Sequence, residues 1–137
     1  MIKKIFLVSF VILLLIFITF SNQTPLFKDY SDNFEIYTKS PSSNAQIVCT
    51  NSKTYPLIFG KVGESCKIFG EFDLSSFLMK MGAKTVFTEK AEHGVSYYAY
   101  SNDIKYKASV NGHVVNLHVF IGDSGVTVGS PIIFGSF

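Results

Sequence analysis

The sequence predicts an α+β fold, in which an antiparallel, meander-rich β-sheet carries one short helix on one face and follows an N-terminal signal or anchor helix. Three observations predict this class: an apolar run after the N-terminus, one amphipathic helical pattern, and apolar–polar alternation through the second half of the chain. We expect residues 1–21 to be a signal peptide or signal-anchor helix, residues 22–33 a linker, and residues 34–137 a single α+β domain.

The N-terminal segment has the layout of an export signal. Lys3 and Lys4 precede an apolar run over residues 5–20, which only Ser9 and Thr19 interrupt. As a helix this run spans about 24 Å, less than the ~30 Å hydrocarbon core of a bilayer, which favours a signal peptide. Few small residues are present for a cleavage site, so the alternative is that this helix stays uncleaved as a membrane anchor. In both cases the domain is expected outside the cytoplasm, because the lysines stay inside.

Three short strands are expected before the helix, over residues 34–39, 45–50 and 64–69. Cys49 and Cys66 lie in the second and third of these strands, in phase with apolar neighbours. Either both thiols are small buried side chains, or they form a disulfide between strands in an oxidising compartment. A metal-binding pair is not expected, because no other cluster of soft ligands accompanies them.

Residues 74–81 are expected to form the helix of the domain. The apolar stripe has the spacing i, i+3, i+4 and i+7 and consists of Leu74, Phe77, Leu78 and Met81. Asp73 is a suitable N-cap, Phe72 is placed to pack on Phe77 as a hydrophobic staple, and Gly82 ends the helix. A helix this short is marginal alone, so it must dock on the sheet.

The stretch over residues 84–134 is expected to form a run of antiparallel strands. Asn111-Gly112 predicts a type I′ hairpin loop, because both central residues of that turn need positive φ. The pairs that follow from this loop are Val110 with His113, Ala108 with Val115, Tyr106 with Leu117, and Ile104 with Val119.

A second loop, at residues 122–125, gives an independent check of the registers. It sets Ile121 opposite Val126, and the pairing that follows keeps apolar residues together on one face of the sheet. Pro131 lies inside the last expected strand and has no N–H for the ladder. That strand should therefore lie at an edge or end its pairing there.

The alternation also defines an opposite face, which is expected to be exposed. The candidate binding face on it comprises Tyr98, Tyr100, Lys105, Lys107, Asn116, His118 and Phe120. Aromatic and polar side chains on a rigid sheet are suited to bind a peptide, a glycan or a protein partner. The alternatives are a solvated surface, or a face covered by the N-terminal strands.

The composition argues against nucleic acid as a partner. The formal net charge is +2, the chain has no arginine, and Lys3 and Lys4 account for the excess over the acidic residues. Proteins that bind nucleic acids usually present a basic patch with arginines for phosphate and guanine. We expect no nucleic-acid partner.

The sequence offers few catalytic groups. His113 and His118 are five residues apart, so on one strand they point to opposite faces and cannot bind one metal together. No hydrolase, zinc-protease or nucleotide-binding motif is found, and we expect no enzyme activity, no cofactor and no metal. The catalytic alternative is a small envelope hydrolase using His118, which needs a concave pocket with a nucleophile or carboxylate in reach. A purely structural domain is a further alternative.

Three segments of the C-terminal stretch occur together in a particular order: residues 95–101 (VSYYAYS), 115–119 (VNLHV) and 126–132 (VTVGSPI). In this order and spacing they resemble the C-terminal part of the YwmB-like family, exported proteins of spore-forming Gram-positive bacteria. The resemblance covers the last third of the chain. It implies a fold like that of the TATA-box-binding protein, with helices against one face of a curved sheet, and no catalytic residues. Family members carry two such units, so a full saddle would require two of these chains to pair as a homodimer.

The sequence therefore predicts a non-catalytic, extracytoplasmic domain. It would be secreted, or anchored to the cell membrane by an uncleaved N-terminal helix. We expect it to act as an envelope- or sporulation-related binding module whose partner is a protein or an envelope ligand.

Overall fold

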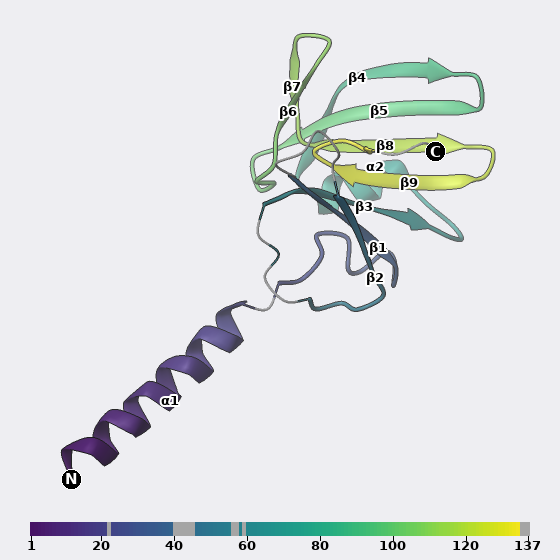
Figure 1. Ribbon diagram of the computed structural model, residues 1–137. Coiled ribbons are helices and arrows are strands. Elements are labelled where there is room, and N and C mark those ends of the chain that lie inside the picture. Colours follow the sequence, from purple (N-terminus) through teal and green to yellow (C-terminus); the bar gives the residue numbers. More distant parts are fainter. Residues whose placement is uncertain (22, 40–45, 56–57, 59, 135–137) are drawn as a thin grey trace.

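The structure, a computed structural model, describes residues 1–21, 23–39, 46–55, 58 and 60–134. Within these residues it contains a seven-stranded sheet, a separate two-stranded hairpin and two helices (Figure 1). All the strand pairs are antiparallel. The α+β class is confirmed.

The strand order of the large sheet is β2-β1-β3-β9-β8-β5-β4, so the first and second halves of the chain meet where β3 pairs with β9. The strands of the large sheet are β1 (Phe34–Thr38), β2 (Gln46–Thr50), β3 (Lys61–Ile68), β4 (Ala83–Ala91), β5 (Gly94–Ser101), β8 (Leu117–Gly122) and β9 (Gly125–Ser130). The hairpin consists of β6 (Ala108–Val110) and β7 (His113–Val115). β9 ends directly before Pro131, as its missing N–H predicts.

Helix α2 (Leu74–Lys80) begins where the sequence predicts and ends one residue earlier than expected, with Met81 as its C-cap. The Asp73 carboxylate caps it by accepting a 2.6 Å hydrogen bond from the Ser76 N–H, which holds the pKa of Asp73 below its usual range. Gly82 follows with a φ of +59°. The Phe72 and Phe77 rings lie 5.3 Å apart, so the hydrophobic staple is confirmed.

The core lies between α2 and one face of the sheet, which we call the inner face. Phe77 is buried in it against sheet residues such as Ile36, Val119 and Val128. The predicted linker covers residues 22–33, and its described part, residues 23–33, packs on the core through Phe27. Phe27 in this segment is fully buried in the same cluster. The segment therefore closes the core from the N-terminal side.

The Asn111-Gly112 loop is confirmed, since these residues have φ values of +50° and +80°. The pairs of Ala108 with Val115 and of Val110 with His113 are also as predicted. The pairs predicted beyond them are wrong, because residues 104–107 form no strand and β8 leaves the hairpin. In the structure, Leu117 pairs with Ala99 and Val119 pairs with Tyr97, both on β5.

Asn116 is the physical reason for this change of partner. Its buried side chain accepts a 2.8 Å hydrogen bond from the Ser101 N–H and donates to the carbonyl oxygens of Ser101 and Ile104, at 2.6 Å and 3.1 Å. The side-chain amide thus takes the place of a backbone partner where the chain departs from β5. The other predicted register is confirmed, with Ile121 opposite Val126.

Gly112→Ala is expected to destabilise the protein by about 1 kcal/mol, because only glycine adopts its positive φ without strain. No atom lies within 4 Å of the position that a Cβ would take, so the effect should come from the backbone alone. Urea unfolding measures it. Gly112→Asn is the control and should lower the free energy of unfolding by less, since asparagine tolerates this conformation. Equal stability of Gly112→Ala and the wild type would contradict a type I′ loop.

Helix α1 (Ile2–Ser21) extends away from the sheet and exposes apolar side chains such as Phe6 and Phe17 (Figure 1). The expected N-terminal helix is therefore present. In the part of the chain that the structure describes, no helix is long and apolar enough to cross a membrane.

The cysteines do not form the disulfide that was one of the two interpretations. Both are free, and Cys49 is exposed while Cys66 is buried. β1 lies between their strands, and the register sets Cys49 opposite Glu35 and Glu35 opposite Ser65. Cys49 therefore shares a face with Ser65, whereas the next residue, Cys66, points to the other face. The interpretation as buried small side chains is right for Cys66 only.

Candidate functional site

The predicted binding face is largely closed in the folded protein. The structure buries three of its residues, Asn116, His118 and Phe120. Tyr98 and Tyr100 are half-buried. Lys105 and Lys107 are exposed, but they lie in the connection between β5 and β6 and not on the sheet. The expectation of an open face is therefore wrong for the residues at its centre.

The C-terminal tail, residues 131–134, covers this face, which we call the outer face. The Ile133 N–H donates a 3.2 Å hydrogen bond to Nδ1 of His118. The Phe134 ring lies 4.8 Å from the ring of Tyr37. A Cβ on Gly129 would lie 2.9 Å from the Ile132 carbonyl oxygen, so the tail approaches the sheet where β9 lacks a side chain. The cover comes from this tail and not from the N-terminal strands.

One row of residues crosses the outer face through the paired strands. It runs Phe87, Tyr98, His118, Gly129, Ser65, Glu35 and Cys49. The Tyr98 ring stacks on Phe87 at 4.5 Å and on His118 at 4.3 Å. The tail crosses this row at Gly129, so it separates the stacked rings from the polar residues on β3, β1 and β2.

His118 is held in one hydrogen-bonding state. Because Nδ1 accepts from the Ile133 N–H, the ring proton lies on Nε2, which donates to the Ser96 hydroxyl at 3.0 Å. Burial lowers the pKa of His118 to about 4, and its exposed fraction is 2%. A base that activates Ser96 would need a bare Nε2 and an open approach. This geometry provides neither, so it does not meet the requirements of the His118 hydrolase alternative.

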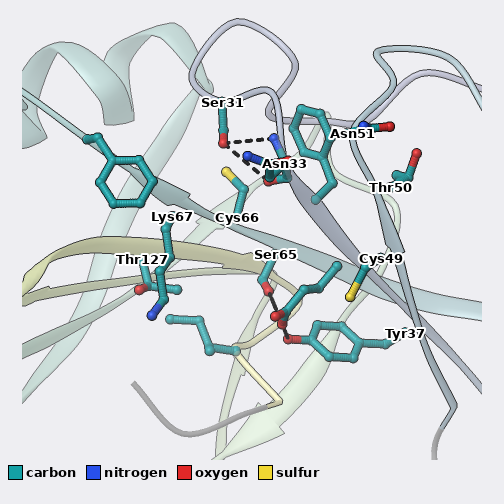
Figure 2. A pocket seen from close by; sticks show the side chains of 14 residues that line it. Ser31, Asn33, Tyr37, Cys49, Thr50, Asn51, Ser65, Cys66, Lys67 and Thr127 are labelled. Atoms are coloured by element: carbon teal, nitrogen blue, oxygen red, sulfur yellow. Dashed lines mark hydrogen bonds between the residues drawn. The ribbon is translucent and has the colours of Figure 1, made fainter.

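A cavity of about 590 Å³ opens on the other side of the tail (Figure 2). Ile133 forms part of its wall, and the polar end of the cross-sheet row lies in it. We call this cavity the lateral hollow. Figure 2 shows the Tyr37–Ser65 hydrogen bond on one side of it and the Ser31–Asn33 contacts on the other.

A hydrogen-bonded cluster of three side chains anchors the lateral hollow. The Tyr37 hydroxyl donates to Glu35 Oε2 at 3.1 Å and lies 2.8 Å from the Ser65 hydroxyl. Tyr37 and Ser65 are buried, whereas Glu35 is exposed. Burial raises the pKa of Tyr37, against the opposing effect of the Ser65 hydrogen bond, so the phenol keeps its proton as a donor. The cluster therefore fixes the orientation of an accessible carboxylate.

The rest of the lining is mostly uncharged. Amide and hydroxyl groups come from Ser31, Asn33, Thr50, Asn51 and Thr127, and Phe69 supplies an exposed aromatic ring, whereas the ring of Phe34 is buried in the core. Burial, with a smaller effect of the Glu64 charge, raises the pKa of the Cys66 thiol to about 12, so this thiol is also neutral. Such a lining suits a ligand with many hydroxyl or amide groups and an apolar surface.

Apart from Cys49 and Cys66, the residues that line the hollow are not among the site residues that the sequence predicts. The signal that was available is the alternation in the first expected strand, which places Glu35 and Tyr37 together on the face opposite Phe34 and Ile36. Their contact with Ser65 requires the register between β1 and β3, which local patterns do not predict. Within the described residues, no group of three or more His, Cys, Asp or Glu side chains could hold a metal ion.

The fold and the hollow define an α+β domain whose sheet is covered on one face by a helix and on the other by its own C-terminal tail. Comparison of the chain with protein-family models, with curated proteins and with solved structures found no match.

Proposed function

We propose that this chain is an exported, non-catalytic domain that binds a glycan of the cell envelope in the lateral hollow. The observation that carries the proposal is the combination of a fixed, accessible carboxylate with uncharged hydrogen-bonding groups and the exposed Phe69 ring around one cavity. Sugars present hydroxyl and amide groups at their edges and C–H groups on their faces. The lining of the hollow offers partners for both.

Electrostatics also favour an uncharged or weakly charged ligand. The charged side chains among the described lining residues are Glu35 and Lys67, one of each sign. A strongly anionic ligand would meet the Glu35 carboxylate, and a strongly cationic one would meet the Lys67 ammonium. A glycan with N-acetyl and hydroxyl groups avoids both costs.

The N-terminal helix supports export. Its apolar side chains lie outside the core, and Lys3 and Lys4 precede them, which is the layout that a secretion signal requires. The resemblance to the YwmB-like family implies the same location. Intact-mass measurement of exported protein, with and without reductant and alkylation, tests whether residues 1–21 are removed or retained. It should also find Cys49 and Cys66 unpaired. Recovery of the full chain from the cytoplasm alone would contradict export.

Glu35→Gln is expected to weaken glycan binding about tenfold, because it removes a charged acceptor of hydrogen bonds without changing the side-chain shape. The test is calorimetric titration of the full chain, in a nonionic detergent, with soluble oligomers of N-acetylglucosamine. Retention on purified peptidoglycan is measured in parallel. Tyr37 and Ser65 stay in place in this variant, so the fold should be unchanged.

Glu92→Gln is the matched control. Glu92 is also an exposed glutamate, but it lies in the turn between β4 and β5 and outside the lateral hollow. It should bind as the wild type does. If both variants bind the glycan equally well, the lateral hollow is not the glycan site. A lack of binding by the wild type to either probe would reject the glycan proposal and favour a structural role.

A further inference from the structure

A second cavity, of about 360 Å³, lies on the inner face of the sheet. Its walls come from four places: the segment after α1 at residues 24–28, the start of β3, the connection at residues 103–106, and Ser130 at the end of β9. Lys61 and Glu64 line it, and only 9% and 3% of their side-chain surfaces are exposed. Buried charges need partners, so the neighbours of this pair decide what the cavity can hold.

The buried pair neutralises itself. Lys61 Nζ donates to Glu64 Oε2 and to the Tyr55 hydroxyl, and the Leu26 N–H donates to Glu64 Oε1. Burial alone would lower the pKa of Lys61, but the hydrogen bonds to Glu64 and Tyr55 outweigh burial and raise it. Lys61 therefore keeps its proton and its charge in the buried site. The contacts named here use two of the three N–H donors of Lys61.

Ser130 supplies an independent sign that the cavity has an occupant. It lies opposite Glu64 in the register between β3 and β9 and lines the same cavity. Its exposed fraction is 1%, and its hydroxyl has no hydrogen-bond partner among the residues that the structure describes. A buried hydroxyl without a partner is costly, so we expect an acceptor inside the cavity to accept a hydrogen bond from it.

The rim of the cavity is basic and its walls are partly apolar. Lys28 and Lys105 are exposed and line it. The acidic residues in the described lining are Glu64, which pairs with Lys61, and Asp103. Ile104 and Tyr106 provide apolar wall. The ammonium groups of Lys61 and Lys105 lie 5.8 Å and 5.6 Å from the centre of the Tyr106 ring. After the Lys61–Glu64 pair is set aside, the remaining charge favours an anion.

From this arrangement we propose that the inner cavity binds a small organic monoanion. Its oxyanion head would accept hydrogen bonds from the Ser130 hydroxyl and from Lys61, while its apolar body would lie against Ile104 and Tyr106. The volume is at the lower end of that of small-molecule sites, which limits the ligand to a compact acid. The described linings of this cavity and of the lateral hollow have no residue in common, so the proposal does not depend on glycan binding.

The test is an NMR titration of the isotope-labelled full chain, in a nonionic detergent, with three probes. Benzoate carries the proposed head and body, benzamide is its neutral counterpart, and inorganic phosphate is an anion without an apolar body. Benzoate should give saturable shifts at the amides of Ser130 and Tyr106 and should bind about tenfold more tightly than benzamide. No saturation by benzoate at concentrations of about 20 mM would overturn the proposal. If phosphate binds as tightly as benzoate, the proposal that the ligand has an apolar body is wrong.

Variants assign the donors. Ser130→Ala should weaken benzoate binding about tenfold, and Lys105→Gln about threefold, because an exposed lysine contributes less. Lys107→Gln is the matched control, since Lys107 is exposed in the same connection but does not line the cavity, and it should bind like the wild type. If Ser130→Ala does not fold, the comparison of Lys105→Gln with Lys107→Gln still tests whether benzoate binds in this cavity. Equal affinities in these two would place benzoate elsewhere and reject the site.

Discussion

Phe77→Ala is expected to lower the free energy of unfolding by about 3–5 kcal/mol. The Phe77 ring is the centre of an aromatic cluster that joins α2 to the N-terminal segment. It lies 4.9 Å from the ring of Tyr30, 5.3 Å from that of Phe72 and 6.3 Å from that of Phe27. Removing it leaves a cavity that neither the short helix nor the sheet can close, so the loss includes the missing contacts as well as the transfer energy.

Urea unfolding of the full chain, followed by circular dichroism, measures this loss. Met79→Ala is the control, because Met79 lies on the same helix with 79% of its surface exposed. It should change the free energy of unfolding by less than about 0.5 kcal/mol. A loss for Phe77→Ala no larger than that of Met79→Ala would show that α2 does not hold the core together.

Acidification from about pH 6.5 to pH 4 is expected to cost about 3 kcal/mol of stability through His118 alone. Burial lowers the pKa of this histidine from 6.5 to about 4 in the folded protein. Between these values the unfolded chain binds the proton and the folded protein does not. Stability therefore rises with pH across this window, and it is lost as the pH falls.

Protonation of His118 also has a structural consequence. A proton on Nδ1 removes the acceptor that the Ile133 N–H uses, and it places a charge under the C-terminal tail. We therefore expect the tail to be the first part of the outer face to loosen in acid. The stacked ring of Tyr98 would then become more exposed.

His118→Gln separates this effect from the titration of carboxylates. Glutamine can accept from Ile133 and donate to Ser96, but it does not titrate. The measurement is the free energy of unfolding by urea at half-unit steps between pH 7 and pH 4. The variant should show a smaller slope over this range than the wild type, whatever its stability at pH 7. Parallel curves would mean that His118 is not the buried titrating group.

The local elements were predictable because short-range patterns specify them. Asp73, the Phe72–Phe77 staple and Gly82 define α2 within a few residues, and Asn111-Gly112 defines its loop by backbone conformation alone. The pairs predicted beyond this loop are wrong, because they require the hairpin to continue past Ala108 and Val115. The Asn116 side chain ends the hairpin through contacts with residues far back along the chain.

The two cavities could not be predicted in the same way. Glu35 and Tyr37 share a face by alternation, but Ser65 joins them only because β1 pairs with β3. Likewise, Glu64 and Ser130 are far apart in sequence and become neighbours when β3 pairs with β9. A period-2 pattern says which residues share a face of one strand, and it does not say which strands are neighbours.

Local sequence patterns are sufficient to specify the α+β class, the start of α2, the hairpin loop and the apolar side of the strands. Each of these depends on interactions between residues close together in the chain. The covering of both faces of the sheet follows from long-range packing alone. The tail after Pro131 occupies the outer face above Gly129, and Phe27 closes the inner face. These segments carry no periodic pattern of their own, and the surface that they bury becomes available only once distant strands have paired.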